Sequence, residues 1–357
     1  MKIIHTGDVH LGAAFESLPK EKSRIRRVEL MDSFTRLCAY AKESDVSAVL
    51  IAGDLFDDNQ TPSYIKKQAL YAIESAKPVR FFYVSGNHDD EFLGDGLPSN
   101  LFLFSQNHTW QSYDLGDGVV VSGLDTKNLD AQTLSSLRLV PDAFHIVLLH
   151  GDVQGSGKEA IDLRLLQNKN IDYLALGHIH KPDLESKRLD ARGSYRYCGC
   201  LEGRGFDEIG NRGFFLLDVV QNRIVGEKLL SFSKRAVREV RVDISACESY
   251  FDVESTALNE LKNISVDDTV KIVLCGNVSP KLRKDIALLT ARLSGRLFHV
   301  KVVDESKIRI DIKDFENDRT ERGEFVKEVG RYAMNERQRA EILEVGLKAL
   351  AGEEIDL

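Results

Sequence analysis

Five short clusters of metal-binding residue types are spread over the first half of the sequence. Each cluster follows a run of apolar residues, and together they contain five of the nine histidines. In chain order they are Asp8 and His10 in "GDVHLG", Asp54 and Asp57 in "GDLFD", Asn87, His88 and Asp89 in "GNHDD", His150 in "LLHGD", and His178 and His180 in "GHIH". Imidazole, carboxylate and amide donors without thiolate suit divalent ions such as Mn²⁺, Fe²⁺, Zn²⁺ or Mg²⁺.

The number of these donors predicts two ions rather than one. Two ions roughly 3.5–4 Å apart can share a bridging carboxylate, lower the pKa of a bridging water and hold a phosphoryl group for in-line attack. The chemistry predicted for such a site is hydrolysis of a phosphoester.

Each cluster also has a purely structural explanation. Gly-Asp and Gly-Asn are common turn sequences after strands, and an isolated His-x-His is often a solvated turn. The two histidines of "GHIH" project to the same side of an extended chain, which a shared target would require. The occurrence of all five clusters at predicted strand ends favours one common site.

The elements that must position these clusters alternate between strand and helix. Strands over residues 2–8 and 46–54 flank a helix over 23–44, and a second helix over 61–77, with Pro62 at its first helical position, precedes a strand over 79–87. The ends of parallel strands meet at one edge of a sheet. Further strands are predicted over 119–125, 144–152, 171–180, 195–200, 213–220 and 223–232, the later ones spaced like antiparallel hairpins.

The pattern restarts beyond Lys234 as a small α/β region. Strands over 238–245 and 269–277 alternate with helices over 253–264 and 280–295, and segments 297–305 and 307–313 are predicted to form a strand pair. The residues from Asp318 onward read as acid-rich helix with few apolar anchors, which fits either partner docking or ordinary packing. The predicted domains are 1–235, 236–315 and 316–357.

Composition excludes several classes of protein. None of the apolar runs in the 357 residues approaches the roughly 20 that a membrane span needs, and the N-terminus lacks the features of a signal peptide. Five scattered cysteines indicate neither a disulfide framework nor a cysteine zinc site. A cytoplasmic protein with no membrane association is expected. No P-loop motif occurs, so any dependence on ATP requires a partner.

Taken in order, the five motifs resemble the calcineurin-like metallophosphoesterase superfamily over roughly the first 205 residues. The resemblance implies an α/β (α+β) four-layer sandwich of two mixed β-sheets flanked by helices, followed here by a small α/β capping domain and C-terminal helices. It implies that Asp54 bridges the two ions, that His88 acts as general acid or transition-state donor, that Asp89 orients His88, and that Asp57 lies behind the ligands. The implied ligands of one ion are Asp8, His10, Asp54 and His180, and those of the other are Asp54, Asn87, His150 and His178.

A narrower resemblance concerns the substrate. "DVHLG", "GDLFDDNQTPS", "GHIHKP" and the Gly-rich "YCGCLEGRGFDEIGNRGF" resemble the Mre11/SbcD group of DNA repair nuclease subunits. This resemblance implies an exonuclease, with endonuclease activity as a further option, that uses two Mn²⁺ ions, with Fe, Zn or Mg as alternatives. It also implies DNA as substrate, an SbcC/Rad50-like coiled-coil ATPase as partner, and action as a homodimer.

The charged residues of the sequence argue partly against and partly for DNA as the substrate. The net charge is −8, whereas DNA-binding proteins usually carry a basic surface. One stretch of the second region is basic, and its candidate phosphate contacts are Lys281, Arg283, Lys284, Arg292 and Arg296. Arg204 is a further candidate. The structural alternative for the basic stretch is a solvated helix face. For Arg204 it is a turn formed by the neighbouring glycines.

Two other functions remain open. A phosphodiesterase or phosphatase acting on a small nucleotide or a phosphoprotein would need the same ions and no DNA-binding surface. A scaffold without catalysis would have lost some of the motif residues, and every one of them is present.

Overall fold

The computed structural model describes residues 1–58, 61–89, 96–104, 109–157, 159–279, 282–309, 315 and 318–351. The chain divides into two compact units, Met1–Val237 and Arg238–Leu357. The predicted metal-binding clusters all belong to the first unit.

The first unit contains a six-stranded mixed sheet with the strand order β12-β11-β1-β2-β3-β4. Its strands are β1 (Lys2–Thr6), β2 (Ala48–Ala52), β3 (Arg80–Val84), β4 (Leu101–Leu103), β11 (Gly213–Val220) and β12 (Arg223–Ser231). Strands β1 to β4 pair in parallel, and β11 pairs antiparallel with both β1 and β12. The parallel part is the predicted βαβ arrangement.

A second six-stranded sheet has the order β5-β6-β7-β8-β10-β9. Its strands are β5 (Gln111–Gly116), β6 (Val119–Gly123), β7 (Phe144–His150), β8 (Tyr173–Gly177), β9 (Lys187–Arg188) and β10 (Ser194–Tyr197). Strands β6, β7, β8 and β10 run parallel, whereas β5 pairs antiparallel with β6 and β9 with β10. Of the later strands that were predicted to form antiparallel hairpins, β11 and β12 do so. The crossovers contain only a short helix α3 (Ala131–Ser136) and the 3₁₀ turns η1 (Thr126–Asn128) and η2 (Leu163–Leu165), which carry little helical periodicity.

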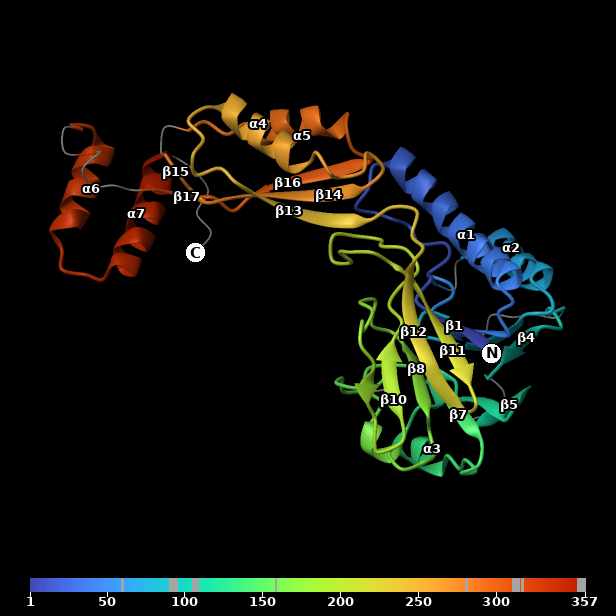
Figure 1. The fold of residues 1–357 in the computed structure, drawn as a ribbon. Helices are drawn as coiled ribbons and strands as arrows, with labels where there is room; N and C mark the ends of the chain where they lie inside the picture. The colour runs from blue at the N-terminus through green and yellow to red at the C-terminus, as the bar shows by residue number, and fades with distance from the viewer. Residues whose placement is uncertain are drawn as a thin grey trace. The chain divides into compact units, whose positions relative to one another are not determined.

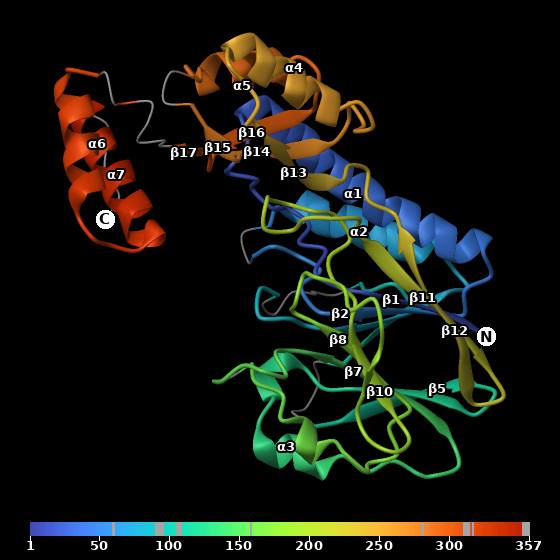
Figure 2. The same ribbon diagram turned by 60° about the vertical axis from the view of Figure 1, so that its left-hand side comes forward.

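The two sheets pack face to face with helices on their outer sides, as Figures 1 and 2 show. Apolar side chains from both sheets, including Leu50, Phe82, Ile146 and Leu148, form the core between them. Helices α1 (Lys20–Glu43) and α2 (Ser63–Ser75) cover the first sheet, while α3 and its neighbouring loops cover the second. The predicted four-layer sandwich is therefore confirmed.

Helix α1 follows directly from the spacing of its apolar residues. Leu30, Phe34, Leu37, Cys38 and Ala41 recur at intervals of three and four, and all of them are buried against the first sheet. Helix α2 begins at Ser63, one residue later than predicted, with Pro62 as its N-cap.

The second unit contains a three-stranded sheet with the order β13-β14-β16. Its strands are β13 (Val237–Asp243), β14 (Thr269–Cys275) and β16 (His299–Asp304), and helices α4 (Tyr250–Glu260) and α5 (Ile286–Ser294) pack on it around a core of their own. The short strands β15 (Asn277–Val278) and β17 (Lys307–Ile308) pair in parallel. In the part of the predicted strand pair 297–305 and 307–313 that the structure describes, β16 pairs with β14 and β17 with β15, and residues 310–313 lie outside the described residues.

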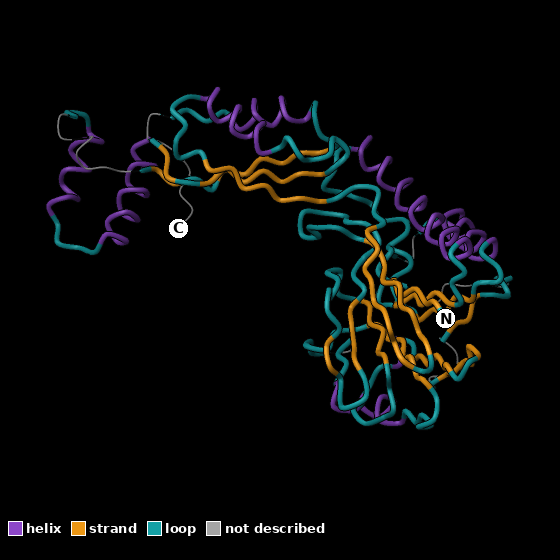
Figure 3. The backbone as a smooth tube through the Cα atoms, in the orientation of Figure 1, coloured by secondary structure: helices purple, strands orange, loops and turns teal. Residues whose placement is uncertain are grey.

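The C-terminal part consists of the helices α6 (Glu321–Arg331) and α7 (Glu336–Ala351), which Figure 3 shows in purple. Their contact is a small cluster that includes Phe315, Val326, Val329, Leu343 and Leu347. Among the residues that the structure describes, no helix combines the length and the apolar character needed to cross a bilayer. The assignment of a capping domain and a docking segment to these elements stays a prediction.

Candidate metal centre

The predicted ligands lie at the carboxyl ends of five strands of the two sheets. Asp8 and His10 follow β1, Asp54 follows β2, Asn87 follows β3, His150 ends β7, and His178 and His180 follow β8. Strands β1 to β3 belong to the first sheet and β7 and β8 to the second. The site thus lies where the carboxyl ends of strands from both sheets come together.

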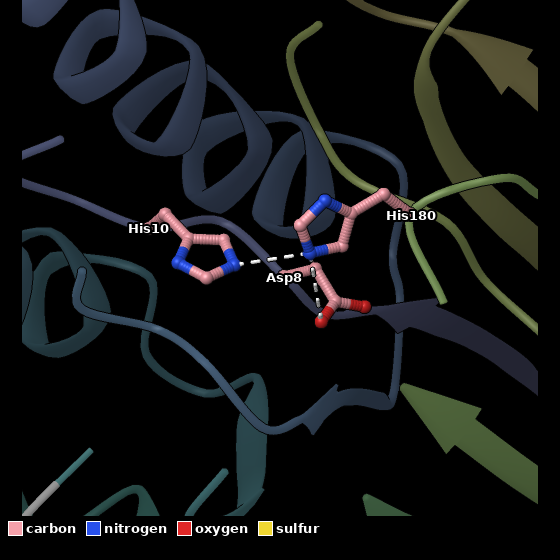
Figure 4. A group of neighbouring side chains, drawn as sticks. All are labelled: Asp8, His10 and His180. Atoms are coloured by element: carbon pink, nitrogen blue, oxygen red, sulfur yellow. Dashed lines mark hydrogen bonds and ion pairs between the residues drawn. The ribbon is translucent and has the colours of Figure 1, made fainter. Parts of the chain in front are cut away.

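Asp8, His10 and His180 form one compact group of donor atoms, drawn in Figure 4. The Nε2 atoms of His10 and His180 lie 3.2 Å apart, and His180 Nε2 lies 3.8 Å from Asp8 Oδ1. His10 Nε2 also lies 3.6 Å from Asp54 Oδ2. The four residues predicted to hold the first ion are therefore together.

Asp8, Asp54 and His150 form a second group. His150 Nε2 lies 3.5 Å from Asp54 Oδ2 and 2.9 Å from Asn87 Oδ1. Asp54 is therefore close to donor atoms of both groups, which is the position that a bridging ligand would need.

His178 lies beside this second group. Its ring meets that of His150 edge-on with the ring centroids 5.1 Å apart, and its Nε2 lies 3.7 Å from the Glu159 carboxylate. Its main-chain N–H donates to both carboxylate oxygens of Asp8 at 3.0 Å. The structure thus places His178 near its expected partners, and its role as a ligand stays a prediction.

The donor atoms converge in a way that requires a cation. His150 donates its Nδ1 hydrogen to the carbonyl oxygen of Ala52 at 2.9 Å, so its Nε2 carries a lone pair that faces the Asn87 oxygen. His10 and His180 direct their Nδ1 atoms at carboxylates of Asp57 and Glu208, at 3.3 and 2.6 Å, which likewise leaves two Nε2 lone pairs facing each other. Acceptors that face acceptors are stabilised by a positive ion between them.

The charges of the buried groups agree with this interpretation. Burial and the neighbouring Asp54 carboxylate raise the pKa of Asp8 well above its usual value. Burial lowers the pKa of His10, and it lowers the pKa of His150 to about 4. His10 and His150 are therefore neutral, as metal ligands must be, and a bound cation would favour the charged form of Asp8.

The backbone at the site adopts conformations that non-glycine residues rarely take. Asp8, His10, Asp54 and His178 have φ values of 48°, 50°, 47° and 101°. Such left-handed residues cost on the order of 1–3 kcal/mol each, and they cluster at functional sites. Position 86 is restricted to glycine for a steric reason instead, because a Cβ there would lie 2.0 Å from Asp54 Oδ1.

His88 and Asp89 lie beside the centre, but their predicted contact is wrong. His88 Nδ1 is hydrogen-bonded to the main-chain oxygen of Asp57 at 2.8 Å, so Asp57, and not Asp89, orients the ring. The Asp89 carboxylate is buried and accepts main-chain N–H groups of Leu55, Phe56 and Gly86 at 2.9–3.1 Å. Burial and the charge of Asp54 raise the pKa of Asp89 to about 6. Asp89 therefore holds the two loops that carry Asp54 and Asn87.

Arg204, which the sequence analysis named as a candidate, lies at the centre. Glu208 also lies there, although the sequence analysis did not predict it. The Arg204 guanidinium contacts Asp57 Oδ1 and Glu208 Oε1, each at 3.2 Å. Burial alone would raise the pKa of Glu208, but the hydrogen bond with His180 and the charge of Arg204 lower it to about 2. The only sequence signal was an acid four residues after Arg204, in the Gly-rich stretch that follows the strand predicted over 195–200.

The basic residues of the second unit are partly neutralised. Lys284 forms an ion pair with Asp304 at 2.6 Å, and Arg292 pairs with Glu254 at 2.8 Å. Arg283 and Arg296 are exposed, and Lys281 lies outside the described residues. Because α5 begins at Ile286, Arg283 and Lys284 precede the helix instead of lying on its face.

Similarity to known proteins extends over most of the chain. The protein is 28% identical over 246 residues to the uncharacterized metallophosphoesterase YhaO of Bacillus subtilis (strain 168), an alignment that covers 63% of this chain and 59% of YhaO. It is 27% identical over 316 residues to the DNA double-strand break repair protein Mre11 of Haloferax volcanii, covering 85% of this chain and 68% of that protein. Mre11 of Aeropyrum pernix is 27% identical over 73% of this chain and 68% of its own length. The chain thus spans less than two thirds of YhaO.

Solved structures are also similar to part of the chain. A dimetal phosphatase from Danio rerio is 10% identical with a TM-score of 0.45, covering 65% of this chain and 99% of its own. The family described as calcineurin-like phosphoesterase matches residues 1–182. The chain belongs to the calcineurin-like phosphoesterase family.

Proposed function

We propose that this protein is a dinuclear-metal-dependent phosphodiesterase that hydrolyses DNA in DNA repair, as the nuclease subunit of a complex with an SbcC/Rad50-like ATPase. The observation that carries the proposal is the convergence of uncompensated donor atoms from both sheets on one site. The similarity to Mre11 supports DNA as the substrate, since one alignment spans 85% of the chain and so extends beyond the phosphoesterase domain.

The proposed ligands are those that the motifs imply, with Asp54 as the bridge. Asp8, His10 and His180 would complete the site of one ion, and Asn87, His150 and His178 that of the other. Bound Mn²⁺ ions would supply Lewis acidity and a hydroxide nucleophile at neutral pH. The buried carboxylates and neutral imidazoles of the chain provide the negative charge and the lone pairs that such ions need.

His88 would act on the substrate directly. Its ring lies at the centre, with its centroid 5.1 Å from that of His10, and the bond from Nδ1 to the Asp57 carbonyl fixes the ring orientation. Nε2 is then the atom available to a leaving oxygen. In the imidazolium form both ring nitrogens carry protons, and Nε2 would then protonate or stabilise that oxygen by donating to it.

DNA binding would involve exposed cations and Arg204. Arg283 and Arg296 are exposed on the second unit, whereas Lys284 and Arg292 are already paired with acids. Arg204 contributes a cation close to the ligands. Two paired cations and a net charge of −8 also favour a second candidate function, which is a phosphodiesterase or phosphatase acting on a small nucleotide or phosphoprotein.

The ATPase partner would dock on the C-terminal helices. Ile342, Val345 and Leu350 of α7 are 44%, 39% and 41% exposed, although they are apolar. Apolar side chains left exposed along one helix are typical of a partner-binding surface. A homodimer and a cytoplasmic location stay predictions that rest on the resemblance and the sequence alone.

The test is Mn²⁺-dependent hydrolysis of end-labelled single- and double-stranded DNA, beside bis-p-nitrophenyl phosphate, with the His88→Ala variant. His145→Gln is a matched control, because His145 lies at the opposite end of β7 from His150. DNA degradation by wild type and control, lost in His88→Ala, is the expected result. Hydrolysis of the small ester alone, unchanged when the ATPase is added, would favour the second candidate. Absence of all metal-dependent hydrolysis would refute both.

A further inference from the structure

Glu208 was not among the predicted site residues, yet its side chain makes several contacts within the candidate metal centre. Its side chain is 5% exposed, and its Oε1 atom lies 2.6 Å from His180 Nδ1. Its Oε2 atom accepts the main-chain N–H of Arg204 at 2.6 Å and faces the thiol of Cys200 at 3.6 Å. The carboxylate is therefore fixed on both oxygens, and one of them is directed at a proposed ligand.

Hydrogen-bonding chemistry determines the state of His180. A carboxylate accepts hydrogen bonds, so the 2.6 Å contact requires the proton on Nδ1. Arg204 Nη2 is also 3.0 Å from this nitrogen, but both groups are donors, so this second approach is a contact and not a hydrogen bond. The lone pair of Nε2 is thereby directed toward His10 and Asp8.

Arg204 joins Glu208 to the other histidine of the same group. Its guanidinium contacts Glu208 and Asp57, and Asp57 Oδ1 lies 3.3 Å from His10 Nδ1. One cation thus holds the two carboxylates that face the Nδ1 atoms of His10 and His180. His150 is oriented independently, because its Nδ1 donates to the main-chain oxygen of Ala52.

We infer that Glu208 is a positioning residue that fixes the His180 tautomer. Through Arg204, the affinity of the ion site formed by Asp8, His10 and His180 also depends on this carboxylate. The ion site of His150 does not depend on it. The inference rests on the proposed metal ligands. Groups behind a metal-binding histidine set its tautomer and ring orientation, and removing them typically costs about 10–100-fold in metal affinity.

The experiment is a Mn²⁺ titration of the full chain, followed by the electron paramagnetic resonance signal of the free ion. Wild type is expected to bind two ions, and Glu208→Ala to bind one of them about 10–100-fold more weakly while the other is unchanged. Glu208→Gln keeps an acceptor of similar shape and should lose less. Asp207→Asn is the matched control, since Asp207 is the exposed neighbour, and it should bind like wild type.

A double variant separates orientation from charge. If Glu208→Ala acted only by leaving the Arg204 cation unneutralised, then Arg204→Ala combined with Glu208→Ala would restore the affinity, and that result would overturn the inference. Two ions bound by Glu208→Ala with wild-type affinities would overturn it as well.

A second measurement needs neither a bound ion nor a folded variant. Selective ¹⁵N labelling of histidine in the metal-free wild-type chain should show the His180 proton on Nδ1, and a proton on Nε2 would refute the role of Glu208. A wild-type chain that binds no Mn²⁺ would instead refute the proposed metal site, so the two failures are distinguishable.

Discussion

A buried ion pair between α1 and the loop after β10 should contribute strongly to the stability of the first unit. Arg26 Nη2 lies 2.8 Å from Glu202 Oε2, with side chains that are 3% and 0% exposed. Glu202 also accepts the Ser33 hydroxyl at 2.6 Å and the Lys234 main-chain N–H at 2.5 Å. Replacing Glu202 with Ala leaves two donors without this acceptor and leaves the buried Arg26 with Glu29, at 2.8 Å, as its remaining ionic partner. Because one partner remains, we expect a loss of about 3 kcal/mol in the free energy of unfolding, at the lower end of the range for breaking a buried pair.

Removing both charges together should cost much less than the sum of the single changes. In Arg26→Met combined with Glu202→Leu, neither charge remains in the low-dielectric interior, so the penalty of an unpaired ion disappears. The coupling free energy from the double-mutant cycle should be about 2 kcal/mol or more.

Urea unfolding followed by tryptophan fluorescence measures these differences. The single tryptophan, Trp110, lies in the first unit and donates to the Thr133 carbonyl at 2.7 Å. The control is the Asp162 and Arg164 pair, which has a similar distance of 2.7 Å with side chains 36% and 84% exposed. Asp162→Ala should cost far less than Glu202→Ala, because water screens both charges of this pair. Equal costs for Glu202→Ala and Asp162→Ala, or additive single changes, would refute the reasoning.

The remaining predictions concern catalysis, metal and pH. His88→Ala should retain both ions and lose about 10²–10⁴-fold in turnover, and an active, metal-loaded variant would contradict its proposed role. Asp54→Ala should lose both metal and turnover, measured by metal content and ester hydrolysis. Mn²⁺ at 100 times its dissociation constant should raise the free energy of unfolding by about 2.7 kcal/mol for each bound ion over that in EDTA, and equal values would argue against a metal site. Burial and the charge of Arg196 lower the pKa of His5 to about 3, so the unfolded chain binds a proton that the folded chain does not. Stability is therefore lost as pH falls below about 6.5, by roughly 2 kcal/mol at pH 5, and His5→Gln should show a correspondingly smaller slope.

The residue pattern was sufficient to predict the parallel α/β part and the meeting of the clusters, whereas the four layers were implied by the family resemblance. Strong apolar runs that end in Gly-Asp, Gly-Asn or Gly-His mark strand ends, and the parallel arrangement of β1, β2 and β3 brings these ends to one edge. The second sheet was harder, because short crossovers between parallel strands resemble hairpin loops in sequence.

Contacts between distant loops could not be predicted from local patterns. Glu208 meets His180 from 28 residues away, and Asp89 meets the main chain of Leu55 and Phe56 across two loops. Neither residue pairs with its target by helical or strand spacing. The glycines before the clusters were interpreted as turn formers, whereas Gly86 is required by the close approach of Asp54.

The left-handed backbone at Asp8, His10, Asp54 and His178 has an evolutionary consequence. Glycine is the residue that adopts such φ values without strain, so glycine at these positions would relax the backbone while deleting a proposed ligand. A population selected only for thermal stability in the absence of metal should accumulate such glycines and lose hydrolysis. The Asp and His residues at four strained positions are therefore explained by the chemistry of the site rather than by the needs of the fold.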